Sequence, residues 1–310
     1  MEEEKLIIDV ETEEERRMDQ FLADQMEYSR SFIQKLIKNE SVTVNGNVIT
    51  KVKYPVSFRD KIIIEIPAPT ELEIKPEKMD LDILYEDNDV IVIDKPKGMV
   101  VHPSAGHMSH TLVNGLLYHC KGNLSGINGV LRPGIVHRID MDTTGAIIAC
   151  KNDIAHQSLA KQLQVHSITR KYEAIVYHNL QEETGTIDKP IGRHPVHRKK
   201  MAVVQPEKGK RAVTHYRVLS HLNHKFNYIE CQLETGRTHQ IRVHMASIMH
   251  PLLGDELYGP KPQKMFEKLQ GQTLHAKILG FQHPVTNQYI EVESPLPQYF
   301  VELLKNLGNS

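Results

Sequence analysis

Residues 67–82, PAPTELEIKPEKMDLD, divide this chain of 310 residues into two unequal parts. The stretch is rich in proline and charge and has neither helical nor strand periodicity, which is typical of a linker. A chain interrupted in this way folds as two domains with separate cores, in line with the usual domain size of roughly 100–200 residues. We therefore predict a small domain over residues 16–67, a linker over 68–80 and a large domain over 81–310.

The amino-terminal part changes from helical to strand periodicity along its length. Apolar residues at 21–22 and again at 32–37 recur at helical spacing and predict two short helices. Ser41 to Val44 then alternate toward the turn dipeptide Asn45-Gly46, and residues 61–66 (KIIIEI) predict a further strand. We expect a compact unit built from helices and strands.

The larger part contains short apolar runs separated by loops and a few helices. Strands are predicted at residues 90–93, 146–150 and 172–177. Helices are predicted at residues 109–118, 154–163 and 239–248. Because strands and helices do not alternate as in a βαβ fold, we predict the α+β class: a mixed, largely antiparallel sheet flanked by helices and loops, with a central cleft.

The composition is that of an ordinary globular protein, with 40% hydrophobic and 25% charged residues. No run of about 18 apolar residues occurs, so no membrane association is expected. The first fifteen residues carry eight acids and one lysine, the opposite of a signal peptide, and predict a cytoplasmic protein with a disordered acidic tail. Cys120, Cys150 and Cys231 form no CxxC pair, which indicates reduced packing residues.

Positive charge is concentrated in one segment, although the net charge of the chain is only −1. Residues 193–211, RHPVHRKKMAVVQPEKGKR, hold seven lysines or arginines and one glutamate. Such a segment is suited to binding phosphates, and a solvated surface loop is an equally good interpretation of this segment alone.

Asp140 lies in the densest cluster of unusual residues, Arg132 to Gly145 (RPGIVHRIDMDTTG), between a Gly-rich loop and a buried strand. A carboxylate that is partly desolvated yet ionised beside Arg138 could act as a nucleophile. The alternative, which an isolated aspartate favours, is a turn in which the acid caps a backbone N–H group.

Two further segments contain candidate functional residues. Residues 233–244, LETGRTHQIRVH, open a predicted helix and place Arg237 and Arg242 where they could face a carboxylate or phosphate. Alternatively, these are surface arginines of an amphipathic helix. Tyr172 begins a strand in Thr169 to Glu173, where an ordinary core aromatic is the simpler interpretation.

Cofactor and metal motifs are missing from the sequence. Neither GxGxxG nor GxxxxGK[ST] occurs, so no nucleotide cofactor is expected. His102, His107 and His110 lie close together in HPSAGHMSH, but they lack the spacing of HExxH and have no nearby acid or cysteine. We expect no metal site there and favour a structural or RNA-contacting role.

Several long segments resemble the RluA/RluD family of RNA pseudouridine synthases. Its three signature regions resemble GIVHRIDMDTTGAIIACKND, RKYEAIV and LETGRTHQIRVHMASIMHPLLGDELYG, and the flanking segments IDKPKGMVVHP, LHA and FQHP match as well. The resemblance covers roughly residues 81–300. The amino-terminal unit resembles the S4-type RNA-binding domain that many of these synthases carry, with Arg59-Asp60 where Gly-Asp is usual.

This resemblance implies an isomerisation of uridine within RNA. The N1–C1′ bond breaks, the uracil turns, and C5 bonds to C1′, so no cofactor or metal is required. By position, the catalytic aspartate of the family falls on Asp140, the active-site tyrosine on Tyr172, and the arginine that pairs with the aspartate on Arg242. Whether the carboxylate attacks the base, attacks the sugar or supports a glycal route is left open at this stage. A carboxylate beside an oxocarbenium-like centre is the usual protein tool for glycosyl transfer.

The expected partner is RNA, most specifically large-subunit ribosomal RNA, bound by a monomer. Transfer RNA, a non-catalytic role in binding ribosomal RNA, and hydrolysis with release of uracil are the alternatives. The target nucleotide would have to be flipped out of its helix. The residues expected to contact RNA are His137, Arg138 and Arg237 near the site, Arg30, Lys35 and Lys38 in the amino-terminal domain, and Arg198, Lys199 and Lys200 in the basic segment.

Overall fold

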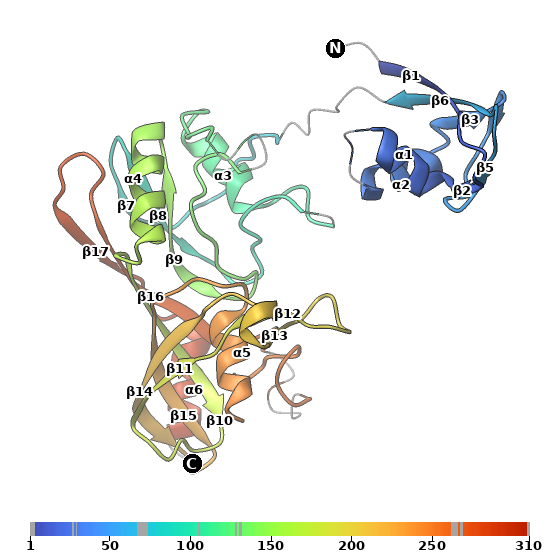
Figure 1. Cartoon of the computed structure of the whole chain (residues 1–310). Coiled ribbons are helices and arrows are strands. Elements are labelled where there is room, and N and C mark those ends of the chain that lie inside the picture. The colour runs from blue at the N-terminus through green and yellow to red at the C-terminus, as the bar shows by residue number, and fades with distance from the viewer. Residues whose placement is uncertain are drawn as a thin grey trace. The chain divides into compact units, whose positions relative to one another are not determined.

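The computed structural model contains two compact units, Met1–Leu72 and Glu73–Ser310 (Figure 1). The residues that the structure describes are 4–26, 28, 30–66, 74–104, 106–127, 129, 132–261, 266 and 269–308. Among these residues, none of the helices combines the length and the hydrophobicity that a bilayer span requires.

The amino-terminal unit packs two helices against a small antiparallel sheet. The helices are α1 (Met18–Gln25) and α2 (Arg30–Lys38). The four-stranded sheet has the order β1 (Glu4–Asp9), β6 (Lys61–Ile66), β3 (Val42–Val44) and β4 (Asn47–Val48), and β2 (Arg16–Arg17) pairs separately with β5 (Pro55–Val56). The predicted helices, hairpin and strand are all present. Apolar side chains at helical and alternating spacing meet in one core.

The charge of residues 1–15 predicts a disordered tail, but part of this tail is ordered. Glu4–Asp9 forms β1, which pairs antiparallel with β6 at the edge of the sheet. Leu6 and Ile8 point inward and pack against the core, whereas Lys5 points outward and forms an ion pair with Glu65. The alternation of apolar residues in KLIID therefore outweighs the surrounding acids, because every second side chain can be buried on one face.

Arg59 marks the one point at which the S4-like pattern departs from glycine. Its φ angle is +69°, in the left-handed region that favours glycine, and its backbone N–H donates to the Val10 carbonyl at 2.9 Å. The guanidinium lies 5.3 Å from the centre of the Phe58 ring. The turn is therefore kept with arginine in place of glycine, at the cost of local backbone strain.

The larger unit is built on a mixed nine-stranded sheet. Among the described strands, only the pairing of β9 with β16 is parallel. Its order is β11 (Thr184–Asp188), β14 (Val213–Leu222), β15 (Phe226–Leu233), β10 (Thr169–Tyr177), β16 (Leu274–Gln282), β9 (Thr144–Cys150), β8 (Val90–Lys95) and β7 (Ile83–Glu86), with β17 (Tyr289–Glu293) paired to β16. The predicted α+β class with a mixed, largely antiparallel sheet is thus confirmed.

Helices cover both faces of this sheet (Figure 1). Side chains of α3 (Leu112–His119) and α5 (Gln240–Ser247) pack with one set of strand residues, and those of α4 (Asp153–Gln164) and α6 (Gln298–Gly308) pack with the alternate sets. Three of these helices were predicted, and α6 was not. Tyr172 belongs to the α3 and α5 face, which therefore is the face that carries the candidate site.

The linker is shorter than predicted. Residues 67–73 lie outside the described residues, but residues 74–80 pack onto the larger unit. Ile74 is buried in its main core, and the Asn114 side chain donates to the Lys75 carbonyl at 2.8 Å. This segment is rich in proline and charge and has no apolar periodicity. The burial of a single isoleucine could therefore not be predicted from its sequence.

Candidate active site

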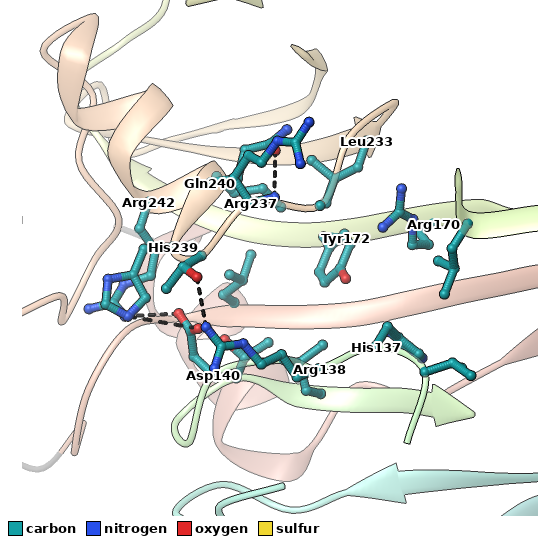
Figure 2. A pocket seen from close by; sticks show the side chains of 18 of the residues that line it. His137, Arg138, Asp140, Arg170, Tyr172, Leu233, Arg237, His239, Gln240 and Arg242 are labelled. Atoms are coloured by element: carbon teal, nitrogen blue, oxygen red, sulfur yellow. Dashed lines mark hydrogen bonds and ion pairs between the residues drawn. The ribbon is translucent and has the colours of Figure 1, made fainter. Parts of the chain in front are cut away.

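A cavity of about 580 Å³ lies between the sheet and the amino-terminal end of α5. Most of its lining comes from three segments that are distant in sequence: the loop before β9, strand β10, and the turn that leads into α5 (Figure 2). His102, the end of α4 and Leu274 of β16 complete the lining. Among the described residues, its lining contains one carboxylate, Asp140, and five arginines: Arg132, Arg138, Arg170, Arg237 and Arg242. This excess of positive charge suits an anionic ligand.

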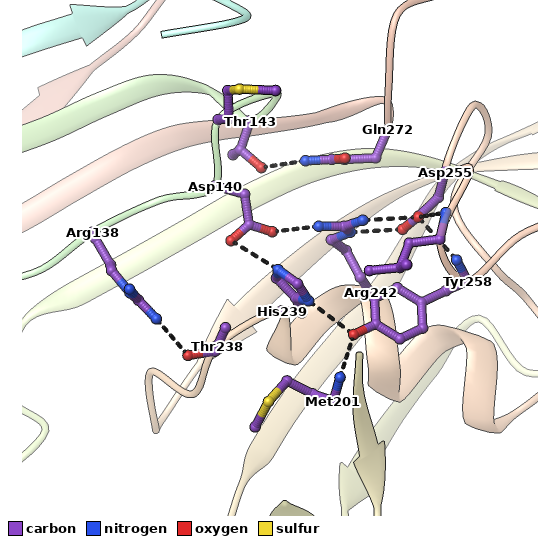
Figure 3. Close-up of polar contacts among 12 residues, drawn as sticks. Arg138, Asp140, Thr143, Met201, Thr238, His239, Arg242, Asp255, Tyr258 and Gln272 are labelled. Atoms are coloured by element: carbon purple, nitrogen blue, oxygen red, sulfur yellow. Dashed lines mark hydrogen bonds and ion pairs between the residues drawn. The ribbon is translucent and has the colours of Figure 1, made fainter. Parts of the chain in front are cut away.

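Asp140 lies at the edge of the cavity and is held on one side only. Its Oδ2 accepts a hydrogen bond from Nη1 of Arg242 at 2.9 Å, whereas Oδ1 lies 3.9 Å from Nε2 of His239, beyond hydrogen-bond distance (Figure 3). The Asp140 carbonyl accepts from the Thr143 N–H at 3.1 Å, which closes the turn. One carboxylate oxygen is thus anchored and the other faces the cavity. The structure brings together Asp140 and Arg242, as the resemblance implies.

Arg242 is fixed from behind by a second carboxylate. Its Nε and Nη2 donate to Asp255 at 2.7 and 2.9 Å, and the Asp255 side chain is fully buried. Burial by itself would lower the pKa of Arg242, but the bonds to Asp255 and the charge of Asp140 raise that pKa above its usual value. A bidentate pair of this kind fixes the plane of the guanidinium, so Nη1 points at Asp140.

His239 connects Asp140 to the hydroxyl of Tyr258. Nδ1 of His239 lies 2.8 Å from that hydroxyl, which also accepts from the Met201 N–H at 2.8 Å (Figure 3). While its oxygen accepts from Met201, the hydroxyl can donate its own proton to Nδ1, an arrangement that leaves the imidazole proton on Nε2, toward Asp140. Burial, ahead of the nearby charges, lowers the pKa of His239. In this tautomer a neutral imidazole presents an N–H group to the site.

Tyr172 stands on β10 between the Cys231 and Ala276 positions of the neighbouring strands. It is 7% exposed and lines the cavity between Arg170 and the loop of Asp140 (Figure 2). Burial raises the pKa of its hydroxyl, which therefore keeps its proton at neutral pH. A ring fixed within a strand offers a rigid surface on which a planar base can stack.

Lys95 fixes the backbone of the loop that carries Asp140. Its ammonium group is fully buried and donates to the carbonyls of Pro96, Met99 and Met141 at 2.8–2.9 Å. Burial lowers the pKa of Lys95 to about 7, against the opposing charges of Asp142 and Asp140. Because Met141 follows Asp140 directly, this cation fixes the backbone on which the carboxylate is carried.

His137 has a backbone partner rather than a free ring. Its Nε2 accepts a hydrogen bond from the Ile148 N–H at 3.1 Å, which requires a neutral imidazole. Burial, with a smaller contribution from the charge of Arg170, lowers the pKa of His137 to about 3. The residue lines the cavity and also ties the loop of Asp140 to β9, while its contact with RNA stays a prediction.

His137 should make the folded state sensitive to acid. The unfolded chain binds a proton at His137 below pH 6.5, whereas the folded chain does so only near pH 3. Stability from this residue is therefore complete above pH 6.5 and is lost as the pH falls. His137→Gln keeps an acceptor but cannot titrate, so its unfolding free energy in urea should fall less steeply between pH 6.5 and 4, by at most about 1.4 kcal/mol per pH unit. Equal slopes for the two proteins would contradict this role.

Arg138 and Arg237 stand at the mouth of the cavity. Nη2 of Arg138 donates to the Thr238 hydroxyl at 2.7 Å, and Nε of Arg237 donates to the Arg211 carbonyl at 3.0 Å. Both side chains lack a carboxylate partner among the described residues and keep further donors for a ligand.

The basic segment forms a hairpin beside the site. Strands β12 (Ile191–Arg193) and β13 (Met201–Val203) pair antiparallel, and the exposed loop between them carries Arg198, Lys199 and Lys200. Lys200 lies 5.9 Å from the centre of the Tyr258 ring, so the hairpin is adjacent to the residues that support Asp140.

The predicted basic residues of the amino-terminal unit differ in their surroundings. Nε of Arg30 donates to the buried Asp19 at 2.9 Å, which gives this arginine a structural role. Lys35 and Lys38 lie exposed on α2. These lysines are therefore the freer contacts for a phosphate backbone.

Asp87, Asp89 and His283 are close enough together to raise the question of a metal. His283 Nδ1 accepts from the Thr286 N–H at 3.1 Å, so its Nε2 carries the proton and donates to Asp87 at 2.8 Å. A metal-bound histidine has the opposite arrangement, with its other nitrogen donating. This cluster fits a hydrogen-bonded turn rather than a metal site.

Sequence reasoning missed several residues of the site. Asp255, Tyr258 and His239 lie within the segments that carried the resemblance, but they were given no role. The GDELYG segment offered a signal, because a buried arginine near a catalytic acid needs a second acidic partner. Arg170 was also missed, although it lies only two positions before Tyr172.

Comparison with known proteins matches both units of the chain. The family model described as RNA pseudouridylate synthase matches residues 89–247, and the S4 domain model matches residues 16–62. The chain is 50% identical over 304 residues to "Uncharacterized RNA pseudouridine synthase YlyB" of Bacillus subtilis (strain 168), with 97% and 98% of the two chains covered. It is 45% identical over 300 residues to "Ribosomal large subunit pseudouridine synthase D" of Zymomonas mobilis subsp. mobilis, with 94% and 93% covered.

A solved structure shows the same architecture. The human protein titled "RNA Pseudouridylate Synthase Domain Containing 4" is 28% identical, with a TM-score of 0.59, and the match covers 73% of this chain and 92% of the human chain. The sequence matches, the fold and a cavity lined by one carboxylate and five arginines therefore lead to the same assignment. This chain belongs to the family of RNA pseudouridine synthases and carries an amino-terminal S4 domain.

Proposed function

We propose that this enzyme isomerises specific uridines of large-subunit ribosomal RNA to pseudouridine, with Asp140 as the nucleophile acting on a flipped-out nucleotide. The observation that carries the proposal is the state of Asp140: one oxygen is bound to a permanently charged arginine, and the other faces a cavity rich in positive charge. Arg242 keeps the carboxylate oriented, and Asp255 keeps Arg242 in place.

The reaction conserves every atom of the nucleotide. The bond from N1 to C1′ breaks, the uracil turns while it remains in the cavity, and C5 bonds to C1′. The proton that C5 then loses is balanced by the proton that N1 gains. Asp140 assists as the glycosidic bond breaks and is regenerated when the new bond forms, as expected for a carboxylate beside an oxocarbenium-like centre. Tyr172 stacks on the uracil and limits where it can turn.

Flipping the target uridine costs a few kcal/mol, which contacts with the rest of the RNA must offset. Arg138 and Arg237 stand at the mouth of the cavity, where they contact the RNA from which the base is extruded. His137 lies deeper, on the cavity wall. The exposed loop with Arg198, Lys199 and Lys200, together with Lys35 and Lys38 of the S4 domain, binds the phosphate backbone, whereas Arg30 is held by Asp19.

The choice of large-subunit ribosomal RNA rests on two observations. Several relatives, including that of Zymomonas mobilis, carry the name "Ribosomal large subunit pseudouridine synthase D" and match over nearly their whole length. The S4 domain at residues 16–62 supplies a second RNA-binding unit, which a substrate of extended structure requires.

Release of tritium from C5-tritiated uridine tests the proposal. We expect the wild-type enzyme to release tritium from unmodified large-subunit ribosomal RNA and not from transfer RNA. Release from transfer RNA alone would contradict the substrate but not the chemistry. Binding of either RNA without release would contradict the proposed activity.

A further inference from the structure

Arg170 is a buried arginine on the cavity wall, and no carboxylate among the described residues balances its charge. It lies on β10, two positions before Tyr172, and is 6% exposed. One of its five N–H groups is accounted for, since Nη2 donates to the Glu234 carbonyl at 3.2 Å. Its Nε is buried without a hydrogen-bond partner, and no carboxylate among the described residues lies within ion-pair distance.

The other buried cations of this unit are fully compensated. Arg242 is held by Asp255 and Asp140, and Lys95 donates to three carbonyls. Arg170 has neither arrangement, and burial accordingly lowers its pKa from the usual value, although arginine stays charged at neutral pH. Retaining an unpaired charge in a buried position costs several kcal/mol. An unpaired buried charge destabilises the fold, but the same charge strengthens the binding of an anionic ligand. This combination is expected of a ligand-binding residue.

Arg170 packs against Gly236 on one side and lines the cavity on the other, so a ligand in the cavity can reach its guanidinium. Gly236 faces the guanidinium, and a Cβ at this position would lie 2.6 Å from Nη1. Tyr172 stands between Arg170 and the loop of Asp140, so the arginine marks the opposite end of the cavity from the catalytic carboxylate (Figure 2). Any group that binds there belongs to the substrate but lies away from the reacting C1′ and C5 atoms.

We propose that Arg170 forms an anion subsite that binds a phosphate group adjoining the flipped uridine. The inference rests on the proposed function, since it places this phosphate on the same substrate. A guanidinium with free N–H groups matches two phosphate oxygens with two parallel hydrogen bonds. The subsite thereby uses the charge of the RNA backbone to hold the nucleotide while the uracil turns over Tyr172.

A double cycle of protein and RNA changes tests the subsite. The probe is a synthetic stem-loop of large-subunit RNA sequence with one loop uridine, in which the phosphate on its 5′ or 3′ side is replaced by a neutral methylphosphonate. For the wild type, one of the two replacements should lower kcat/KM by about thirtyfold, the loss expected for one charge-assisted hydrogen-bond pair. Arg170→Met should lower kcat/KM on the natural RNA by a similar factor. For this variant, the methylphosphonate should lower kcat/KM by less than a further threefold.

The control is Lys305→Met, which removes an exposed charge on α6, where no RNA contact is assigned, and should keep the full thirtyfold response. Arg170→Lys, which retains the charge, should restore part of the response and shows that the position tolerates change. A wild type indifferent to both methylphosphonates, or an Arg170→Met protein that responds as strongly as the wild type, would overturn the subsite. If the wild type releases no tritium, that result counts against the proposed function alone. The subsite is then tested by measuring Kd for the same proteins and RNAs, with the same expected ratios.

Discussion

Asp140→Asn is expected to lower kcat for uridine isomerisation by about 10⁴-fold, the scale on which removal of a nucleophile acts in enzymes. The amide has the same shape as the carboxylate and can still accept from Nη1 of Arg242 through its oxygen. It carries no negative charge, however, and cannot assist cleavage of the glycosidic bond. RNA affinity should stay within about threefold, because the loss falls on chemistry rather than on binding. Single-turnover tritium release and filter binding measure the two quantities.

Asp142→Asn is the matched control for this substitution. Asp142 lies two residues away in the same loop, and burial, partly offset by Lys97 and Lys95, raises its pKa. Because Arg242 donates to Asp140 and Asp255 and not to Asp142, the loss of the Asp142 charge should lower kcat by less than about tenfold. Equal losses for the two variants would show that the loop, and not the Asp140 carboxylate, is what the reaction requires.

Arg242→Met is expected to have the second largest effect and to act in two ways. It leaves Asp255 as a buried charge without its partner, which should reduce the free energy of unfolding of the larger unit by about 3–5 kcal/mol. It also releases Asp140 from its only hydrogen bond to a side chain among the described residues, which should lower kcat by about 10²–10³-fold. Thermal unfolding and tritium release measure these effects separately.

A second substitution separates the two effects of Arg242. In Arg242→Met combined with Asp255→Asn, no charge is left buried and the amide oxygen still accepts from the N–H groups of Leu257 and Tyr258, so stability should return toward that of the wild type while activity stays low. Arg242→Lys keeps a cation but loses the bidentate geometry, and should fall between the wild type and Arg242→Met. Recovery of activity along with stability in the double variant would show that Arg242 serves the fold alone.

The sequence predicted those parts of the fold that depend on local pattern. The helices of the amino-terminal unit, the Asn45-Gly46 hairpin and the strand at 61–66 all follow from periodicity and turn residues. β1 was missed because its alternation is short and set among acids. Helix α6 was missed because it follows a Pro-rich segment and its burial depends on Phe300 and Leu307 reaching a distant sheet.

The candidate site was predictable to a different degree. Asp140, Tyr172 and Arg242 are predicted from long motifs, and the structure places all three on one cavity, while their roles stay predictions. Asp255 and Arg170 were not identified, because their importance depends on which charges meet after folding. A sequence records that an arginine is present, but not whether a carboxylate lies opposite it.

The central claim is that the site isomerises uridine within intact RNA, and analysis of the products tests it most directly. Large-subunit ribosomal RNA is incubated with the enzyme and digested to nucleosides. The nucleosides are separated by chromatography, and their masses are measured by mass spectrometry. With the wild-type enzyme we expect a new nucleoside that has the mass of uridine, and no free uracil. With Asp140→Asn we expect neither the new nucleoside nor free uracil. Free uracil with an abasic site in the RNA would contradict the account and identify a hydrolase.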